Sequence, residues 1–295
     1  MTPQRRAEIL LLFTTLIWGS TFVISKAALD NASPYLFVAL RFTTATVLLT
    51  VFFPGKIRGL TWKSYLPGLI LAVFLYIGFM MQMVGLQYTT ASKSAFFTGM
   101  LVVFTPIVQF LWEKRAPSLG NLIGIVFAAI GLFLLTTPSG ASFNFGDGIT
   151  LLSAALFGFY IVYLDVASAT TDRFHLVYGQ LSATAVFAVI GMVIFEKPHI
   201  NWTTGIISSF LYLTLCATLL TTWIQTRFQG DTVPTRAAVI FTLEPVVAAV
   251  MAYFFRGEEL GLIGIIGGAT IVTGLLISEL SGENALLNRQ IISRN

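Results

Sequence analysis

The sequence is poor in charge, cysteine and histidine, and each scarcity excludes a class of protein. Charged residues make up 10% of the 295 positions, against about 25% in soluble domains, which is too few to cover a surface in water. The single cysteine, Cys216, excludes a disulfide framework and a cysteine zinc cluster. Ten prolines exclude a collagen-like chain. His175 and His199 stand apart at no metal-ligand spacing, so we predict no metal site.

The motifs of membrane-embedded enzymes are also missing from the sequence. It contains no G-x-S-x-G elbow, no H-E-x-x-H pair and no glycine-rich phosphate loop with its lysine. Two midplane aspartates would mark an aspartyl protease, but Asp147 and Asp165 lie near the ends of expected helices. No span carries the acidic or carbonyl filter pattern of a channel. We therefore predict neither an enzyme nor a cofactor, and no ATP hydrolysis.

Apolar residues, by contrast, are abundant and fall in long runs. They make up 56% of the chain, with 26 Phe and 25 Gly, and the mean hydropathy is +0.85. A membrane-spanning helix needs about 20 such residues. This pattern predicts an all-α polytopic membrane protein with ten transmembrane helices. The expected spans are residues 8–29, 34–53, 65–86, 94–112, 119–137, 148–167, 175–195, 204–226, 236–255 and 261–280.

The scarce cations predict the orientation of these spans, because loops on the cytoplasmic side are enriched in Lys and Arg. With the N-terminus in the cytoplasm, that side carries 12 of the 17 cations and the other side carries 3. The cytoplasmic set is Arg5, Arg6, Lys56, Arg58, Lys63, Lys114, Arg115, Arg173, Arg227, Arg236, Arg289 and Arg294; the other set is Lys93, Lys197 and Arg256. We expect a protein of the inner membrane with both termini, including the polar tail 281–295, in the cytoplasm. The basic residues form no stripe, so no nucleic-acid partner is expected.

The chain aligns with itself at a shift of about 139 residues. At that shift Trp18 falls on Phe157, Lys26 on Asp165, Arg41 on Gln180 and Pro106 on Pro245, while Lys93 meets Arg236, and Gly124 and Gly131 meet Gly267 and Gly274, at 143. Residues 1–140 and 141–280 then form two five-helix repeats. Because five is odd, the second repeat is inverted in the membrane. Inverted repeats are typical of secondary transporters, whose substrate site lies near the midplane.

Several motifs together resemble the EamA family of the drug/metabolite transporter superfamily. They are Trp18 to Val23 (WGSTFV) with Lys26, Arg41-Phe42, Thr89 to Ala95 (TTASKSA), Gly146 to Gly148 (GDG), Glu244-Pro245 and Phe255 to Leu260 (FRGEEL). The resemblance covers residues 8 to 280. It implies ten helices in two inverted repeats, a central cavity and, usually, export of amino acids or related metabolites. One departure is Phe157, which replaces the first-repeat Trp18 and makes the halves chemically unequal.

Three ionisable residues inside expected spans are the first functional candidates, since each costs at least about 2.5 kcal/mol in the bilayer centre. Lys26 either reaches the outer interface or serves the cavity. Arg41 pairs with a carboxylate or meets an anionic substrate group. Glu244 binds an ammonium group, exchanges a proton, pairs with Arg41, or makes only a structural hydrogen bond. Pro245 beside it is expected to kink the helix.

Polar and adaptable groups at membrane depth complete the expected site. Trp18 shares a helix face with Lys26. For each aromatic residue or Met, ordinary helix packing or lipid contact is the alternative to lining the cavity. The expected cavity residues are Trp18, Lys26, Arg41, Met81, Gln82, Thr98, Tyr160, Gln180 and Glu244, and the expected hinges are Pro106 and Pro245. Small-residue faces at Gly120, Gly124, Gly264 and Gly268 are expected to pack helices within the monomer or in a homodimer.

The sequence as a whole predicts a secondary transporter of the inner membrane. We expect it to move a small amphipathic metabolite, most often an amino acid or derivative, outward by alternating access. Its expected partners are this small molecule and the lipid bilayer. The alternative is a membrane protein with a structural or receptor-like role and no flux.

Overall fold

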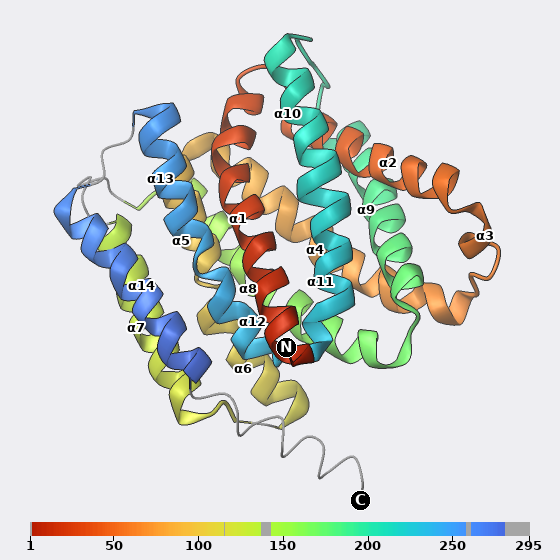
Figure 1. Cartoon of the computed structure of the whole chain (residues 1–295). Helices are drawn as coiled ribbons and strands as arrows, with labels where there is room; N and C mark the ends of the chain where they lie inside the picture. Colours follow the sequence, from red (N-terminus) through yellow and green to blue (C-terminus); the bar gives the residue numbers. More distant parts are fainter. Residues whose placement is uncertain (1, 115, 137–142, 258–260, 281–295) are drawn as a thin grey trace, which may run out of the picture.

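A computed structural model describes residues 2–114, 116–136, 143–257 and 261–280, and every regular element in these ranges is a helix (Figure 1). The first half holds α1 (Pro3–Leu29), α2 (Pro34–Phe52), the short α3 (Pro54–Ile57), α4 (Trp62–Tyr88), α5 (Ala91–Gly99), α6 (Leu101–Glu113) and α7 (Leu119–Thr136). The second half holds α8 (Phe145–Thr170), α9 (Arg173–Phe195), α10 (Thr204–Thr214), η2 (Leu215–Leu220), α11 (Thr221–Phe228), η3 (Gln229–Asp231), α12 (Pro234–Phe241), α13 (Glu244–Arg256) and α14 (Leu262–Leu280). Arg115, residues 258–260 of the FRGEEL motif and the tail 281–295 lie outside the described ranges.

Eight helical stretches of the described chain are long and apolar enough to cross a membrane, judged by length and composition. They are Pro3–Leu29, Pro34–Phe52, Trp62–Tyr88, Ala91–Trp112, Phe145–Thr170, Arg173–Phe195, Thr204–Asp231 and Pro234–Arg256. Two further apolar helices, α7 and α14, are shorter. The expectation of an all-helical, multi-pass membrane protein is confirmed, while the count of ten spans stays a prediction.

Polar side chains just before the apolar runs set where the helices begin. Thr61 and Ser64 form a reciprocal capping box at the start of α4, and Asn144 and Asp147 form another at the start of α8. In each box two side chains satisfy backbone N–H groups that have no partner within the helix. Pro34 occupies the first turn of α2, where its missing N–H is not needed.

The helices α7 and α14 pack closely through glycines, and their contact shows the inversion of the two halves. A methyl group on Gly124 would lie 2.8 Å from the carbonyl oxygen of Gly274, and one on Gly131 would lie 2.6 Å from that of Gly267. The residue number rises along α7 as it falls along α14, so the helices are antiparallel. The shift of 143 carries the first contact onto the second, which fits the two-repeat topology.

The small-residue faces expected from sequence lie in this same region. Gly120, Gly124, Gly264 and Gly268 are all buried within the chain. These faces therefore pack helices inside the monomer. A homodimer stays a prediction, and it would need the outer surfaces of α7 and α14.

A second pair of glycines repeats at the centre of the molecule. A methyl group on Gly19 would lie 2.8 Å from the carbonyl oxygen of Glu244, and one on Gly158 would lie 3.2 Å from the backbone nitrogen of Thr105. Both members of the second contact are related to the first by the shift of 139. In each half, the first long helix thus packs against the broken helix of the other half.

The two broken helices replace continuous expected spans. The span expected at 94–112 divides at Met100, and that expected at 236–255 divides at Thr242 and Leu243. Pro245 follows its break directly, as expected of a residue that interrupts helical hydrogen bonding. Pro106, in contrast, lies inside α6, six residues beyond the break. The breaks meet in space, because a methyl group on Gly99 would lie 2.8 Å from the Pro245 ring. A hinge motion at either proline stays a prediction.

Candidate functional site

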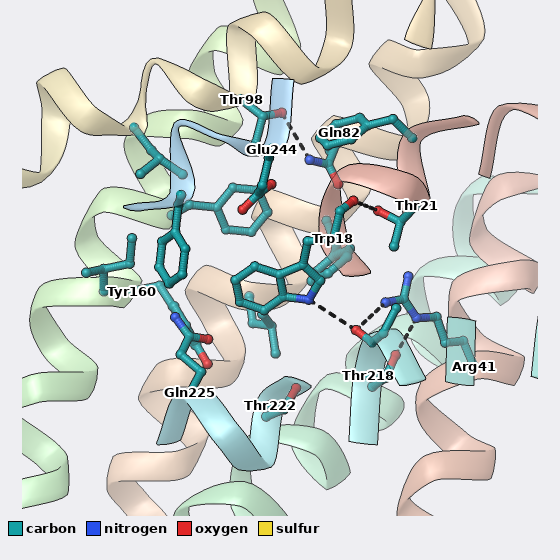
Figure 2. Close-up of a pocket in the computed structure, with 18 of the residues that line it drawn as sticks. Trp18, Thr21, Arg41, Gln82, Thr98, Tyr160, Thr218, Thr222, Gln225 and Glu244 are labelled. Atoms are coloured by element: carbon teal, nitrogen blue, oxygen red, sulfur yellow. Dashed lines mark hydrogen bonds between the residues drawn. The ribbon is translucent and has the colours of Figure 1, made fainter. Parts of the chain in front are cut away.

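A cavity lies between the two halves at the level of the helix breaks (Figure 2), with about 700 Å³ of empty space that includes the part open to solvent. Its walls come from α1, α2, α4, α5 and the start of α6 in the first half and from α8, η2, α11, α12 and α13 in the second. Its polar and amphipathic lining residues are Trp18, Thr21, Arg41, Gln82, Thr98, Tyr160, Thr218, Thr222, Gln225 and Glu244. Its phenylalanines are Phe22, Phe42, Phe79, Phe157 and Phe241. Concave, mostly apolar sites with a few placed polar groups are typical of small-molecule binding.

Arg41 is held in the cavity wall by the second half of the chain. Its guanidinium donates from Nε to the hydroxyl of Thr218 and from Nη2 to the carbonyl oxygen of Ala217, the latter at 3.0 Å. The cation also lies 5.1 Å from the centre of the Phe79 ring. Arg41 is only 3% exposed, so its charge is desolvated and fixed in direction. An anionic group that enters the cavity would meet a preorganised donor.

The acceptors for Arg41 come from a local change of helix type. Residues Leu215–Leu220 form a π-helical turn between α10 and α11. The hydroxyl of Thr218 donates to the carbonyl oxygen of Leu213, five residues earlier, at 2.8 Å. The indole N–H of Trp18 lies 3.3 Å from the carbonyl oxygen of Ala217, which Arg41 also uses. Short π-helical turns inside α-helices are frequent at functional sites because they turn carbonyls and side chains out of register.

Glu244 is the acidic counterpart in the cavity. It is the first residue of α13, where the positive end of the helix dipole favours a carboxylate. Its side chain is 6% exposed and makes no hydrogen bond or ion pair with any described residue, Arg41 included. Figure 2 shows the Glu244 carboxyl and the Arg41 guanidinium on different walls, with Trp18 between them. The pairing of these two residues, one of the alternatives expected for Glu244, is therefore absent from the described part of the chain.

The neutral polar residues expected in the site divide into two layers. Gln82 lines the cavity and donates from Nε2 to the hydroxyl of Thr98 at 3.0 Å. Tyr160 also lines it and donates to Oε1 of Gln180 at 2.7 Å. Gln180 itself is fully buried behind Tyr160 and donates to the hydroxyl of Thr226 at 3.0 Å. It therefore supports the wall rather than facing the cavity.

Six of the nine expected cavity residues line the cavity, and three do not. The six are Trp18, Arg41, Gln82, Thr98, Tyr160 and Glu244; the others are Lys26, Met81 and Gln180. The amine of Lys26 donates to the carbonyl oxygens of Leu86 at 2.6 Å and Thr89 at 2.9 Å, at the end of α4. Lys26 is not among the residues that line the cavity, and its amine binds the last carbonyls of a helix instead. Neither of the roles expected for Lys26 included this one.

A row of polar residues on the eighth expected span, 204–226, was not predicted from the sequence. Thr218, Thr222 and Gln225 all line the cavity. They follow one another at spacings of four and three residues, so they share one helix face. A polar stripe at that spacing within an apolar span is a recognisable pattern, and it would have identified this wall. Within the described residues no group of three or more His, Cys, Asp or Glu side chains could hold a metal ion.

Comparison with known proteins gives one family and a set of relatives. The model of the EamA-like transporter family matches residues 5–137 and again 144–280. A protein named an uncharacterized transporter from Archaeoglobus fulgidus is 32% identical over 93% of this chain and 86% of its own length. The uncharacterized transporter YvbV of Bacillus subtilis is 26% identical over 93% of this chain and 92% of its own. A crystal structure with a TM-score of 0.74 and 17% identity covers 95% of this chain and 99% of that one, which shows a shared fold.

Proposed function

The chain belongs to the EamA-like transporter family, and from that premise we propose that it exports a small amphipathic metabolite, an amino acid or a derivative, by alternating access. The family and the names of the relatives indicate a membrane transporter rather than an enzyme. The proposal adds the substrate class, the direction of transport and the inner membrane as the location. It needs no cofactor, and a gradient of substrate or ion supplies the energy.

The observation that carries the substrate class is the pair of opposite charges in one aromatic cavity. Arg41 offers a desolvated donor for a carboxylate, and Glu244 offers a carboxyl that no described side chain satisfies. An amino acid carries both complementary charges on one small molecule. The faces of the surrounding rings, among them Trp18 and Phe79, can contact an apolar side chain or an ammonium group.

The proposed orientation follows from the distribution of cations. With the N-terminus in the cytoplasm, the cytoplasmic side carries 12 of the 17 cations, and both termini lie there. Export then means that the cavity loads from the cytoplasmic side and releases to the other. Reporter cysteines placed beside Lys63 and Lys197, labelled from one side in intact cells, test this orientation directly.

The test of the function is counterflow in vesicles that contain the purified protein. Vesicles are loaded with one member of a panel of amino acids, amines, carboxylates and sugars, and uptake of the labelled compound is followed. Counterflow for an amino acid that Arg41→Ala and Glu244→Gln each reduce would support the proposal. Arg227→Ala is the matched control, because Arg227 is 41% exposed in an ion pair with Asp231 outside the cavity.

Two rival functions predict different results in the same experiment. A structural or receptor-like membrane protein gives no counterflow for any compound in the panel. An intramembrane enzyme forms product in detergent, where no transport can occur. Counterflow that both cavity variants leave unchanged would remove Arg41 and Glu244 from the mechanism.

A further inference from the structure

Two buried ion pairs join the halves of the chain, one at each end of the bundle. Lys93 on α5 contacts Asp147 on α8, with Nζ 2.8 Å from Oδ2. Arg236 on α12 contacts Glu8 on α1, with Nη2 3.0 Å from Oε1. The carboxylates are 0% and 7% exposed and the cations 14% and 6%. Ion pairs this buried are much less screened than pairs on a surface.

The two pairs are one contact that occurs twice. The shift of 143 carries Lys93 onto Arg236, and the shift of 139 carries Glu8 onto Asp147. Each pair therefore links the fourth expected span of one repeat to the first expected span of the other. The sign of the charge is the same at corresponding positions, so a cation contacts a carboxylate in both pairs.

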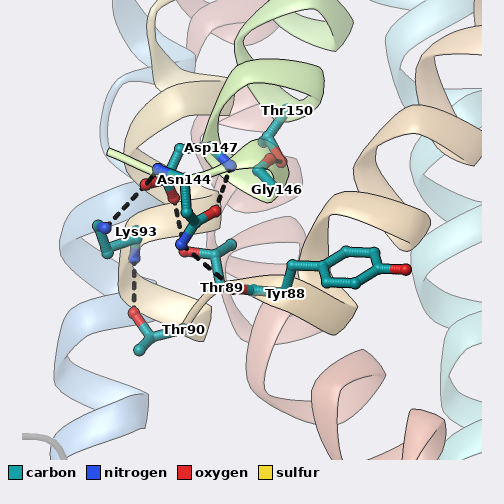
Figure 3. A network of polar contacts seen from close by, with 8 residues as sticks. All are labelled: Tyr88, Thr89, Thr90, Lys93, Asn144, Gly146, Asp147 and Thr150. Atoms are coloured by element: carbon teal, nitrogen blue, oxygen red, sulfur yellow. Dashed lines mark hydrogen bonds and ion pairs between the residues drawn. The ribbon is translucent and has the colours of Figure 1, made fainter. Parts of the chain in front are cut away.

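A threonine repeats with each pair and completes the correspondence. The hydroxyl of Thr89 donates to Oδ1 of Asp147 at 2.7 Å, within the network in Figure 3. The hydroxyl of Thr232, which is Thr89 shifted by 143, donates to Oε1 of Glu8 at 3.3 Å. Each half thus contributes to a cluster in which a carboxylate contacts one cation and accepts a hydrogen bond from one threonine, Lys93 and Thr89 in one cluster and Arg236 and Thr232 in the other.

The clusters lie at opposite ends of the cavity. Glu8 and Lys26 are 18 residues apart on α1, which is about 27 Å of helix. The Lys26 amine lies 2.9 Å from the carbonyl oxygen of Thr89, so the Asp147 cluster sits at the far end of α1 from Glu8. The cavity residues of α1, which are Trp18, Thr21 and Phe22, lie between these two levels.

We propose that the two clusters are the gates of the transport cycle, an inference that rests on the proposed function. The Lys93–Asp147 pair closes the outer end of the cavity, and the Arg236–Glu8 pair closes the cytoplasmic end. Opening one end separates the halves there, breaks that pair and lets water reach both charges, while the other pair stays closed. Because each end is closed by a cation and a carboxylate, opening either end breaks a contact of the same kind, as alternation between two open states requires.

A further ion pair between the halves, among the residues that the structure describes, lacks this pattern and supplies the control. Arg256 contacts Asp30 with Nη1 3.5 Å from Oδ2, and the side chains are 32% and 59% exposed. The shift of 139 carries Asp30 onto Ala169, so the pair has no counterpart at the cytoplasmic end. Asp30→Asn therefore removes an ion pair between the halves without touching a gate.

The experiment measures access to the cavity from each side in the absence of substrate. The background is full-length protein with Cys216→Ser and the reporter Thr21→Cys, in vesicles of known orientation. A membrane-impermeant maleimide is added outside or inside. We expect Asp147→Asn to raise the labelling rate from the outer side on the order of tenfold and to lower it from the cytoplasmic side. Glu8→Gln should give the mirror result, and Asp30→Asn should change neither rate.

Three results would overturn the proposal of two gates. They are a rise in labelling from the same side in both gate variants, a change of the labelling rate of no more than twofold in either, or an effect of Asp30→Asn as large as that of either gate variant. If Asp147→Asn does not elute as a single folded species, Lys93→Met removes the same pair and leaves the α8 cap intact, with the same result expected. The measurement needs no substrate. Labelling that behaves as expected while no metabolite is carried refutes the substrate class alone, and counterflow with unchanged labelling refutes the gates alone.

Discussion

Replacing Glu244 by glutamine separates a binding role from a structural one. The substitution keeps the size of the side chain and removes its charge. Glu244 makes no hydrogen bond or ion pair with a described residue, so the substitution removes no such contact from the described part of the fold. A buried charge without a partner costs free energy, and neutral glutamine should leave the unliganded protein at least as stable.

The effect on ligand binding should be large. A hydrogen bond to a charged group contributes about 1.5–3 kcal/mol, and about 1.4 kcal/mol corresponds to a tenfold change in affinity. If the carboxylate binds the ammonium group of the substrate, Glu244→Gln should weaken binding roughly 10- to 150-fold. The dissociation constant is measured from the rise in thermal midpoint with ligand concentration, and KM from counterflow.

The control and the refuting results follow from the same contacts. Asp231→Asn removes a carboxylate that is 32% exposed and lies outside the cavity, so it should leave both constants unchanged. An unchanged dissociation constant in Glu244→Gln would refute the binding role. A fall in the midpoint of the unliganded protein with no loss of affinity would instead assign Glu244 to the structure.

Three further substitutions test packing and hydrogen bonding. Gly131→Ala should destabilise the protein by about 1–3 kcal/mol, because its methyl group would lie 2.6 Å from a carbonyl oxygen of α14. Gly268→Ala is the control and should not destabilise it, because the nearest contact of its methyl group would be 3.8 Å away. Thermal unfolding of both variants in one detergent compares their stability. Trp18→Phe removes the indole bond to Thr221 at 3.0 Å and should cost about 1 kcal/mol in the same assay. Lys26→Met should lower the unfolding midpoint yet leave the ligand dissociation constant unchanged, and a raised constant would return Lys26 to the substrate site.

The sequence was sufficient to predict where helices lie, because the length of an apolar run is a local property. The span expected at 34–53 corresponds to α2 at Pro34–Phe52, and that expected at 175–195 to α9 at Arg173–Phe195. The span expected at 148–167 is longer in the structure, Phe145–Thr170, because the Asn144 capping box begins the helix before its apolar run. Polar caps are readable in the sequence, so this difference was predictable too.

Features that depend on a partner from the other half could not be predicted in this way. The π-helical turn at Leu215–Leu220 has no local pattern, and it coincides with the contacts from Arg41 and Trp18 of the other half. The break at Met100 is set beside Gly99, where Pro245 approaches from α13, rather than at Pro106. The role of Lys26 depends on where α4 ends, 60 residues away along the chain.

The correspondence between the two halves bears on how one chain could alternate between two open states and also select a substrate. The contacts that we propose as gates are repeated, as in the two ion-pair clusters. The residues that face the cavity are not: Arg41 corresponds to Gln180, and Glu244 corresponds to Thr105. A site made of two equal halves would present equal charges to a substrate, and could not bind the two ends of a zwitterion differently. Loss of symmetry at these positions gives the cavity a cationic wall and an acidic wall, while the ion pairs that we propose as gates keep the same kind of contact at both ends.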